Sequence, residues 1–295
     1  MSATSGSLGQ LAIVDAHIHL WDLQALSYPW LTTRYDHGAP FAPYHAICRN
    51  YLIPDLQQDA ANLRLTKAVH INAAVGHPDP VEETAWVQRQ ADTHGFTLGI
   101  IAGMDLRAHT CAAELERHGE YAGFRGVRMM SFGRDIYADP ATLAGLGRLQ
   151  AANVVCDVDV TLPCFRSVVK AALKYPSLRM VVGHAGLPMG RSADYFQSWS
   201  AGLRSLASAE NILCKISGLG MYDHSWSADS VRPWIETCLE AFGIERCMFA
   251  SNWPVDSLFS SYGKLFDAYA RIVAALGAHE TQKLFAGNAE RYYRI

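Results

Sequence analysis

The stretch "AIVDAHI" at residues 12–18, followed at once by "HLWD" at 19–22, carries the first sign of how this chain folds. A short apolar run of this kind is typical of a buried β-strand. Two histidines, His17 and His19, lie two residues apart in it, and on a strand this spacing puts both imidazoles on one face together with Asp15. Two interpretations are open: the pair has a catalytic or metal-binding role, or both histidines are structural residues of the core. The rest of the sequence distinguishes between them.

Runs like this first one recur along the chain, and together they predict eight strands. The predicted strands are residues 12–18, 67–73, 97–103, 124–130, 153–160, 178–184, 211–217 and 246–251. Helix signals separate them: Asp79-Pro80 and Asp139-Pro140 each place a capping residue before a first-turn proline, and Gly243 ends a helical stretch. Strands that alternate with helices predict a parallel sheet covered by helices.

Eight such units are the number that closes a (β/α)8 barrel, which forms a single domain at this length. We therefore expect a flexible leader at residues 1–10 and a barrel over 11–295, with an aromatic-rich insertion after strand one at 20–53. The insertion is expected to fold over the barrel mouth. Its rings are Trp21, Tyr28, Trp30, Tyr35, Tyr44, His45 and Tyr51. An open doubly wound sheet is the alternative, but no GxGxxG follows the first strand.

The composition excludes several classes of protein. The net charge of −3 over 295 residues gives no support to nucleic acid or an anionic membrane as a partner. No segment approaches the roughly 18 continuous apolar residues of a membrane span, and the polar start "MSATSGSLGQ" does not resemble a signal peptide. Seven cysteines without a CxxC pair indicate reduced thiols. These features predict a cytoplasmic protein that acts on a small molecule, with a homo-oligomer left open.

Polar side chains collect at the carboxyl ends of the predicted strands, where barrel enzymes carry their active sites. The candidates after His17 and His19 are Arg125 and Arg128 on the fourth strand, Asp157 and Asp159 on the fifth, His184 on the sixth, Lys215 on the seventh, His224 in the loop after it, and Asn252 and Asp256 after the eighth. His70 on the second strand is a further one. A buried arginine, lysine or carboxylate needs an opposite charge, so structural ion pairs compete with a functional reading. The clustering at one end favours a site.

The motifs in which these residues stand resemble the lactonase-like branch of the amidohydrolase superfamily, which includes sugar-acid and pyrone-dicarboxylate lactonases. The motifs are "DAHIHLWD" at 15–22, "YPWL" at 28–31, "GVR" at 126–128, "GHAGLP" at 183–188, "CKISGL" at 214–219 and "MFASNWPVD" at 248–256. They run in matching order from about residue 11 to the end of the chain. The resemblance implies the same barrel.

The resemblance also implies a reaction, which is hydrolysis of a cyclic ester or amide by an activated water molecule. The histidines of the family match His17, His19 and His184, and the guanidinium that polarises or anchors the substrate matches Arg128. Many members of the superfamily bind a divalent metal and some lactonases need none, so either state is open here. The three histidines could hold zinc with a position left for water. Arg125, Asp157, Lys215 and His224 are expected to bind substrate.

One position departs from the pattern of the family. The eighth strand is usually followed by Ser-Asp-Trp-Pro, whose aspartate takes the proton from water, and this chain has Asn252 instead. An amide has no proton-accepting pKa near neutrality. Asp256 or Asp157 supplies the base, or a metal held by the histidines makes one unnecessary, or the chemistry differs.

Three functions follow as hypotheses. A hydrolase that opens a small lactone or related cyclic carbonyl compound, in carbohydrate or aromatic-acid catabolism, is the leading one. A metal-dependent decarboxylase or hydratase of the superfamily is the second, because the carboxylate at position 252 is missing. A barrel that binds its ligand without catalysis is the third, and Asn252 is the feature that favours it.

Overall fold

The computed structural model describes residues 8–33, 39–131 and 133–295, so most of the expected leader and Tyr35 lie outside the described residues. Its centre is one sheet of eight parallel strands in the order β1 to β8. The strands are β1 Ala12–Ile18, β2 Arg64–Ile71, β3 Leu98–Gly103, β4 Phe124–Met129, β5 Val155–Val158, β6 Met180–Val182, β7 Ile212–Ile216 and β8 Cys247–Phe249. All eight predicted strands are present, and the last ones are shorter than expected.

The sheet closes on itself where the end of β1 meets the residues that follow β8. The amide of Asn252 donates to the carbonyl of His17 at 2.8 Å, and the amide of His19 donates to the carbonyl of Trp253 at 2.7 Å. Parallel strands in sequential order that return to the first strand form a (β/α)8 barrel. The predicted fold is therefore confirmed, and the alternative of an open doubly wound sheet is wrong.

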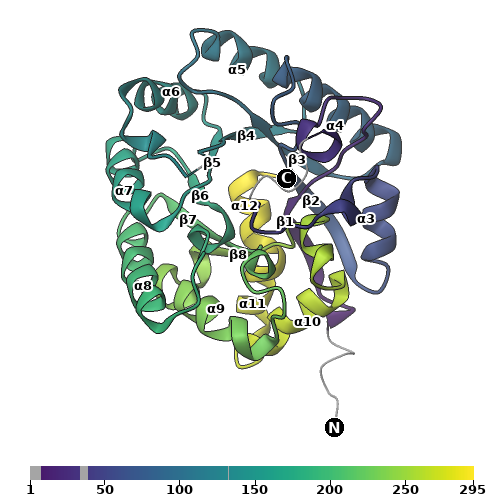
Figure 1. Ribbon diagram of the computed structural model, residues 1–295, viewed down its shortest axis with the longest axis vertical. Coiled ribbons are helices and arrows are strands. Elements are labelled where there is room, and N and C mark those ends of the chain that lie inside the picture. The colour runs from purple at the N-terminus through teal and green to yellow at the C-terminus, as the bar shows by residue number, and fades with distance from the viewer. Residues whose placement is uncertain (1–7, 34–38, 132) are drawn as a thin grey trace.

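Helices surround this ring of strands (Figure 1). The larger ones are α4 Pro80–His94, α5 Cys111–Gly119, α6 Pro140–Ala151, α7 Phe165–Lys174, α8 Ala193–Ala207, α9 Ala228–Phe242 and α10 Tyr262–Ile272. The predicted helix starts are correct: Asp79 caps α4 through the amide of Val81, and Asp139 caps α6 through that of Ala141. No helix among the described residues is long and apolar enough to cross a membrane.

The C-terminal segment covers the amino ends of the strands. It contains α11 Ala278–Gln282, a π-helical turn at Lys283–Gly287 and α12 Asn288–Tyr293, and α12 lies across the centre of the ring in Figure 1. The carbonyl of Ile295 accepts a hydrogen bond from Lys67 near the start of β2, at 2.9 Å. Ala286, Ala289 and Tyr293 pack on the apolar residues inside the barrel. The barrel thus has a closed base and one functional end.

A buried ion pair crosses the barrel interior above this base. The ammonium of Lys215 lies 2.7 Å from Oδ2 of Asp157, and the hydroxyl of Tyr293 donates to the same oxygen at 2.9 Å. Lys215 has no exposed surface and Asp157 is 1% exposed. Burial lowers the pKa of Lys215, while the charge of Asp157 offsets part of that effect. The pairing that the sequence left as an alternative is therefore present.

The insertion after β1 lies at the opposite end, over the carboxyl ends of the strands. Its ends are joined by reciprocal backbone hydrogen bonds of 2.9 Å between Trp21 and Tyr51. The indole of Trp30 donates to the carbonyl of Ala73, just beyond β2, at 2.8 Å, and the hydroxyl of Tyr44 donates to the carbonyl of Trp30 at 2.9 Å. Two short helices, α2 Pro29–Thr32 and α3 Ile53–Asp59, belong to this part of the chain. The insertion thus forms a wall of the barrel mouth.

The ion pair provides a test of the barrel interior. Lys215→Met leaves Asp157 charged, buried and without its cation, so we expect the free energy of unfolding to fall by about 3–5 kcal/mol. Lys215→Met combined with Asp157→Asn should recover more than half of the loss, because the charge is gone and Tyr293 keeps an acceptor. Denaturant titrations measure both values.

The exposed pair of Lys283 and Glu245 serves as the control, since Lys283→Met should cost less than about 1 kcal/mol. A loss for Lys215→Met as small as that of the control would show that Asp157 is stabilised without Lys215.

Candidate active site

The end of β1 is irregular, and this irregularity separates the directions of its polar side chains. The register between β1 and β2 shifts between Asp15 and Ile18. Oδ1 of Asp15 accepts from the amides of His17 (3.2 Å) and Ser251 (2.9 Å), and Oδ2 accepts from the Tyr262 hydroxyl of α10 at 2.7 Å. Asp15 therefore points to the helix layer, and the prediction that it shares a face with the histidines is wrong.

The two histidines of β1 lie against each other at the barrel mouth. Nε2 of His17 is 3.2 Å from Nε2 of His19. Nδ1 of His19 lies 2.8 Å from the carbonyl oxygen of Ile71, and because a carbonyl only accepts, this nitrogen carries the proton and leaves a lone pair on Nε2. The ring of His184 lies beside that of His17, with 4.4 Å between the centroids. The structure thus brings together all three histidines that the sequence singled out.

All three histidines are held neutral by their surroundings. Burial is the largest cause that lowers the pKa of each, and it lowers that of His19 to about 3. The charge of Lys215 acts next on His17 and His184, and the charge of Arg128 acts next on His19. Neutral imidazoles can accept a proton, donate a hydrogen bond or bind a metal.

His184 does not end a strand, as the sequence predicted, but lies in a tight turn at Gly183–Gly186. Its φ of 52° is in the left-handed region, and this turn directs the ring to His17. Nδ1 of His184 is 2.8 Å from the hydroxyl of Ser217. A Cβ at Gly218 would lie 2.6 Å from the same nitrogen, so only glycine leaves room for the ring there.

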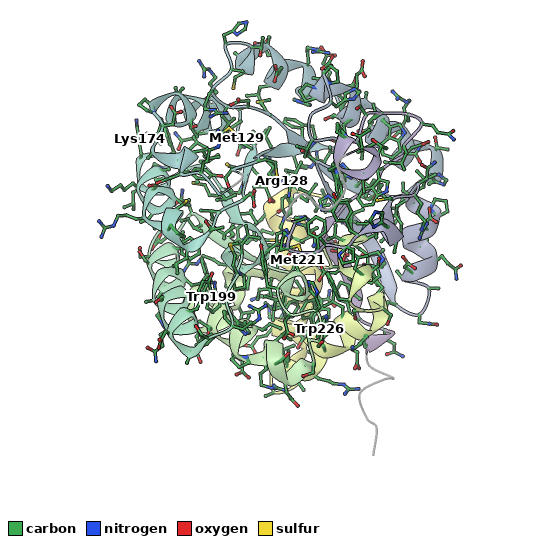
Figure 2. All side chains as sticks on the ribbon, viewed as in Figure 1. Arg128, Met129, Lys174, Trp199, Met221 and Trp226 are labelled. Carbon is green, nitrogen blue, oxygen red and sulfur yellow. The ribbon has the colours of Figure 1, made fainter. Side chains whose placement is uncertain are left out.

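Arg128 reaches the mouth from the end of β4, and Figure 2 shows it toward the middle of the ring. One of its terminal nitrogens donates to the carbonyl of Asn72 at 2.9 Å, while its buried Nε has no hydrogen-bond partner among the described residues. A cavity of about 300 Å³ opens beside it at the carboxyl ends of β2, β3 and β4. Its walls include Asn72, Ala74, Gly103, Met104, Arg128 and Met129.

Asn252 and Asp256 form a buried pair where the strand-eight aspartate of the family is expected. Asn252 has a φ of 60°, which asparagine adopts more readily than most residues, and its Nδ2 donates to Oδ2 of Asp256 at 2.6 Å. Burial raises the pKa of Asp256 to about 7, against the opposing hydrogen bonds from Asn252 and the amide of Gly220. The carboxyl group thus titrates near neutral pH, where acid–base catalysis is most effective.

The structure places one predicted substrate-binding residue, Arg125, away from the barrel mouth and gives a second, His224, other partners. Arg125 starts β4 at the base of the barrel, where it donates to the carbonyls of Arg294 and Ala122 at 3.0 and 2.7 Å. Residues three apart on a strand are about 10 Å apart, so Arg125 and Arg128 serve opposite ends. His224 has other partners: its Nε2 lies 3.0 Å from the carbonyl oxygen of Pro40, and its ring stacks on Phe259.

The polar atoms of the remaining predicted residues, Asp157, Lys215 and His70, bond other groups of the protein. Asp157 and Lys215 form an ion pair with each other, and the charge of Lys215 lowers the pKa of His17 and His184. Nδ1 of His70 accepts from the amide of Leu20 at 3.1 Å, and its Nε2 lies 3.3 Å from Glu83. Both ring nitrogens of His70 thus have partners within the protein.

Sequence reasoning missed Asn72, Glu83 and Ser217. Glu83 stands beside Glu82 in the first turn of α4, and no sequence pattern separates the two acids. Glu83 is 2% exposed, whereas the side chain of Glu82 is 59% exposed. Burial of one acid on an amphipathic helix depends on how the helix is rotated against the barrel.

The spacing of the two Nε2 atoms of His17 and His19 suits a metal ion. Ligand atoms of tetrahedral zinc lie about 3.3 Å apart when the Zn–N bonds are of normal length, and the two Nε2 atoms at 3.2 Å match that spacing. Among the described residues, however, no group of three or more histidine, cysteine or carboxylate side chains is arranged to hold a metal. His17 and His19 therefore fit as ligands, and the expected three-histidine set is not formed.

Comparison with known proteins adds to this geometry. The uncharacterized protein y4mH of Sinorhizobium fredii is 36% identical to this chain, over 98% of the chain and 100% of y4mH. An L-fucono-1,5-lactonase of Burkholderia multivorans is 31% identical over 96% of each protein. A crystal structure of an amidohydrolase from Burkholderia multivorans with bound zinc has a TM-score of 0.82 and 28% identity, and the match covers 96% of this chain and 99% of that one.

The family comparison covers almost the whole chain. The model of the Amidohydro_2 family, described as amidohydrolase, matches residues 14–295. The family predicted from the ordered motifs is thereby confirmed. The chain therefore belongs to the Amidohydro_2 family of amidohydrolases, and it is a hydrolase.

Proposed function

We propose that this protein hydrolyses a small lactone, such as a sugar-acid lactone, or a related cyclic carbonyl compound. The observation that carries the proposal is the group of unused polar atoms at the barrel mouth. The buried Nδ1 of His17 and Nε of Arg128 have no partners among the described residues, and a cavity adjoins Arg128. The relatives named as lactonases support this choice of substrate.

The carbonyl of the substrate is expected to bind at Arg128. Its guanidinium already donates one hydrogen bond to Asn72, which holds it in place, and the free Nε–H can donate to the carbonyl oxygen. Negative charge develops on this oxygen when water attacks, and a fixed cation in a dry site stabilises it. Arg128 thus supplies the electrophilic side of the reaction.

The proton of the attacking water is expected to pass to Asp256. Its pKa of about 7 leaves the carboxylate ionised for part of the time at neutral pH and still basic enough to accept a proton. Asp157, the other candidate base, already accepts from Lys215 and Tyr293. The pair of Asn252 and Asp256 in this way replaces the single aspartate of the family.

The proposal includes a divalent metal ion, of which zinc is the favoured one, and His17 and His19 would hold it. When bound, such an ion polarises a carbonyl and lowers the pKa of a water molecule. The relative solved with zinc supports this ion. The neutral state of both imidazoles is the form that binds metals.

The substrate class can be tested with a panel of aldonolactones, pyrones and simple lactones in a pH-indicator assay. We expect ring opening of at least one sugar-acid lactone, and a loss of at least about a hundredfold in kcat/KM for Arg128→Met. Glu116→Gln, a change of an exposed acid on α5, serves as the control and should keep the native rate. Release of carbon dioxide from an aromatic acid, with no lactone turned over, would contradict the proposal.

Asp256→Asn tests the base. We expect kcat to fall by about 10²–10⁴-fold, because the amide cannot accept a proton. In the native enzyme kcat should decrease as the pH falls through about 7, since Asp256 becomes protonated there, and the residual activity of the variant should lack this decrease. Native activity in Asp256→Asn would assign the base to another group.

The same variant gives a readout that needs no substrate. Because the pKa of Asp256 is raised from 3.8 to about 7 by folding, the folded protein binds this proton more tightly, and native stability is lost as pH rises between these values. Asp256→Asn should lack this loss. Between pH 4 and pH 7.5 the free energy of unfolding of the native protein should therefore fall by about 4 kcal/mol relative to that of the variant. Unfolding curves that shift in parallel would contradict the raised pKa.

Metal binding can be measured apart from activity. We expect the purified protein to hold about one zinc ion by elemental analysis, and the double variant His17→Asn/His19→Asn to hold none. His224→Asn should bind as the native protein does. Full activity of a metal-free preparation would show that the histidines act without an ion.

A further inference from the structure

The carboxylate of Glu83 is buried beside the site and holds four hydrogen bonds. Oε1 accepts from the amides of Ala73 at 2.7 Å and Ala74 at 2.9 Å and lies 3.3 Å from Nε2 of His70, and Oε2 accepts from the side-chain amide of Asn72. Burial would raise the pKa of Glu83, but the hydrogen bonds together lower it. Glu83 is therefore ionised and fully paired.

These partners show that Glu83 does not serve its own helix. Although it lies near the start of α4, all four donors come from residues 70–74, at the end of β2 and just beyond it. A residue that caps a helix or interacts with its dipole would bond the free amides of that helix. The carboxylate instead leaves the helix layer and reaches the barrel mouth.

Because a peptide unit is planar, Glu83 also fixes the carbonyl groups of the peptides whose amides it binds. In a trans peptide the N–H and the preceding C=O point in opposite directions and lie in one plane. The amide of Ala73 that bonds Glu83 belongs to the same peptide as the carbonyl of Asn72, which accepts from Arg128 at 2.9 Å. The next peptide joins the amide of Ala74, also on Glu83, to the carbonyl of Ala73, which accepts from the indole of Trp30 at 2.8 Å.

We propose that Glu83 is a positioning residue, which clamps the peptides 72–73 and 73–74 so that their carbonyls orient Arg128 and anchor the insertion through Trp30. The neighbouring packing agrees with a fixed segment. A Cβ at Gly103 would lie 2.6 Å from the side-chain carbon of Asn72, so β3 leaves room for that side chain only through a glycine. The consequence for turnover rests on the proposed lactonase activity, while the consequence for Arg128 does not.

Glu83→Gln tests the clamp without removing bulk, and Glu116→Gln on α5, an exposed acid, is the matched control. The Nε–H signal of Arg128 in a ¹H–¹⁵N spectrum, assigned by its absence in Arg128→Lys, reports the orientation of the guanidinium directly. We expect this signal to shift in Glu83→Gln and to stay in place in Glu116→Gln. An unchanged signal in a folded Glu83→Gln protein would overturn the proposal, whatever the substrate proves to be.

Kinetics then separate positioning from mere stability. In Glu83→Gln we expect kcat/KM to fall about tenfold to a hundredfold at a temperature well below the midpoint of unfolding. In the Arg128→Lys background the same change should cost less than about twofold, because the two residues act as one unit. Additive losses would mean that Glu83 does not act through Arg128. If Glu83→Gln does not fold, the same spectra and kinetics can be measured on Glu83→Asp. This variant keeps the charge but shortens the side chain by one methylene.

Discussion

The closure of the barrel between β1 and the residues after β8 is the constraint on which the site depends. The hydrogen bonds from Asn252 to His17 and from His19 to Trp253 complete the ring of strands, and three of these four residues belong to the proposed active site. Because the two histidines and Asn252 are joined through their own backbones, their relative positions are set by the same contacts that close the fold. A change that loosened this seam would disturb the histidine pair and the Asn252–Asp256 pair together.

Charge is arranged around this seam in layers. At the bottom, Asp157 neutralises Lys215 inside the barrel, and Tyr293 of α12 closes the group from below. Above it, burial and the charges of Lys215 and Arg128 keep the three histidines neutral. At the rim, a backbone carbonyl holds one terminal nitrogen of Arg128, and its Nε has no partner in the described part of the chain. The proposed site thus combines the guanidinium of Arg128, three neutral imidazoles and the carboxyl group of Asp256, whose pKa burial raises to about 7.

Most of the fold could be predicted because its signals are local. The apolar runs, the Asp-Pro helix starts and the order of the motifs each depend on a few consecutive residues, and the eight strands and the family were correct. The misplaced residues share a different cause. Asp15 was assigned to the face of His17 by the two-residue period of a strand, but a register shift at the end of β1 breaks that period. Arg125 was grouped with Arg128 because both are cations on one apolar predicted strand, although three residues along β4 separate the base of the barrel from its mouth.

The sequence by itself determined the architecture and the family, and it singled out the three histidines and Arg128, because strand periodicity and ordered motifs can be recognised without knowledge of the contacts. Only the tertiary structure decided which atoms remain free for chemistry. It paired Asp157 with Lys215, joined Asp256 to Asn252, placed Arg125 at the base of the barrel, and brought Glu83 from a helix to the end of β2. The physical reason is that a buried charge takes its role from whichever partner the fold places within about 3 Å, and that partner can be distant in sequence, as Lys215 is from Asp157.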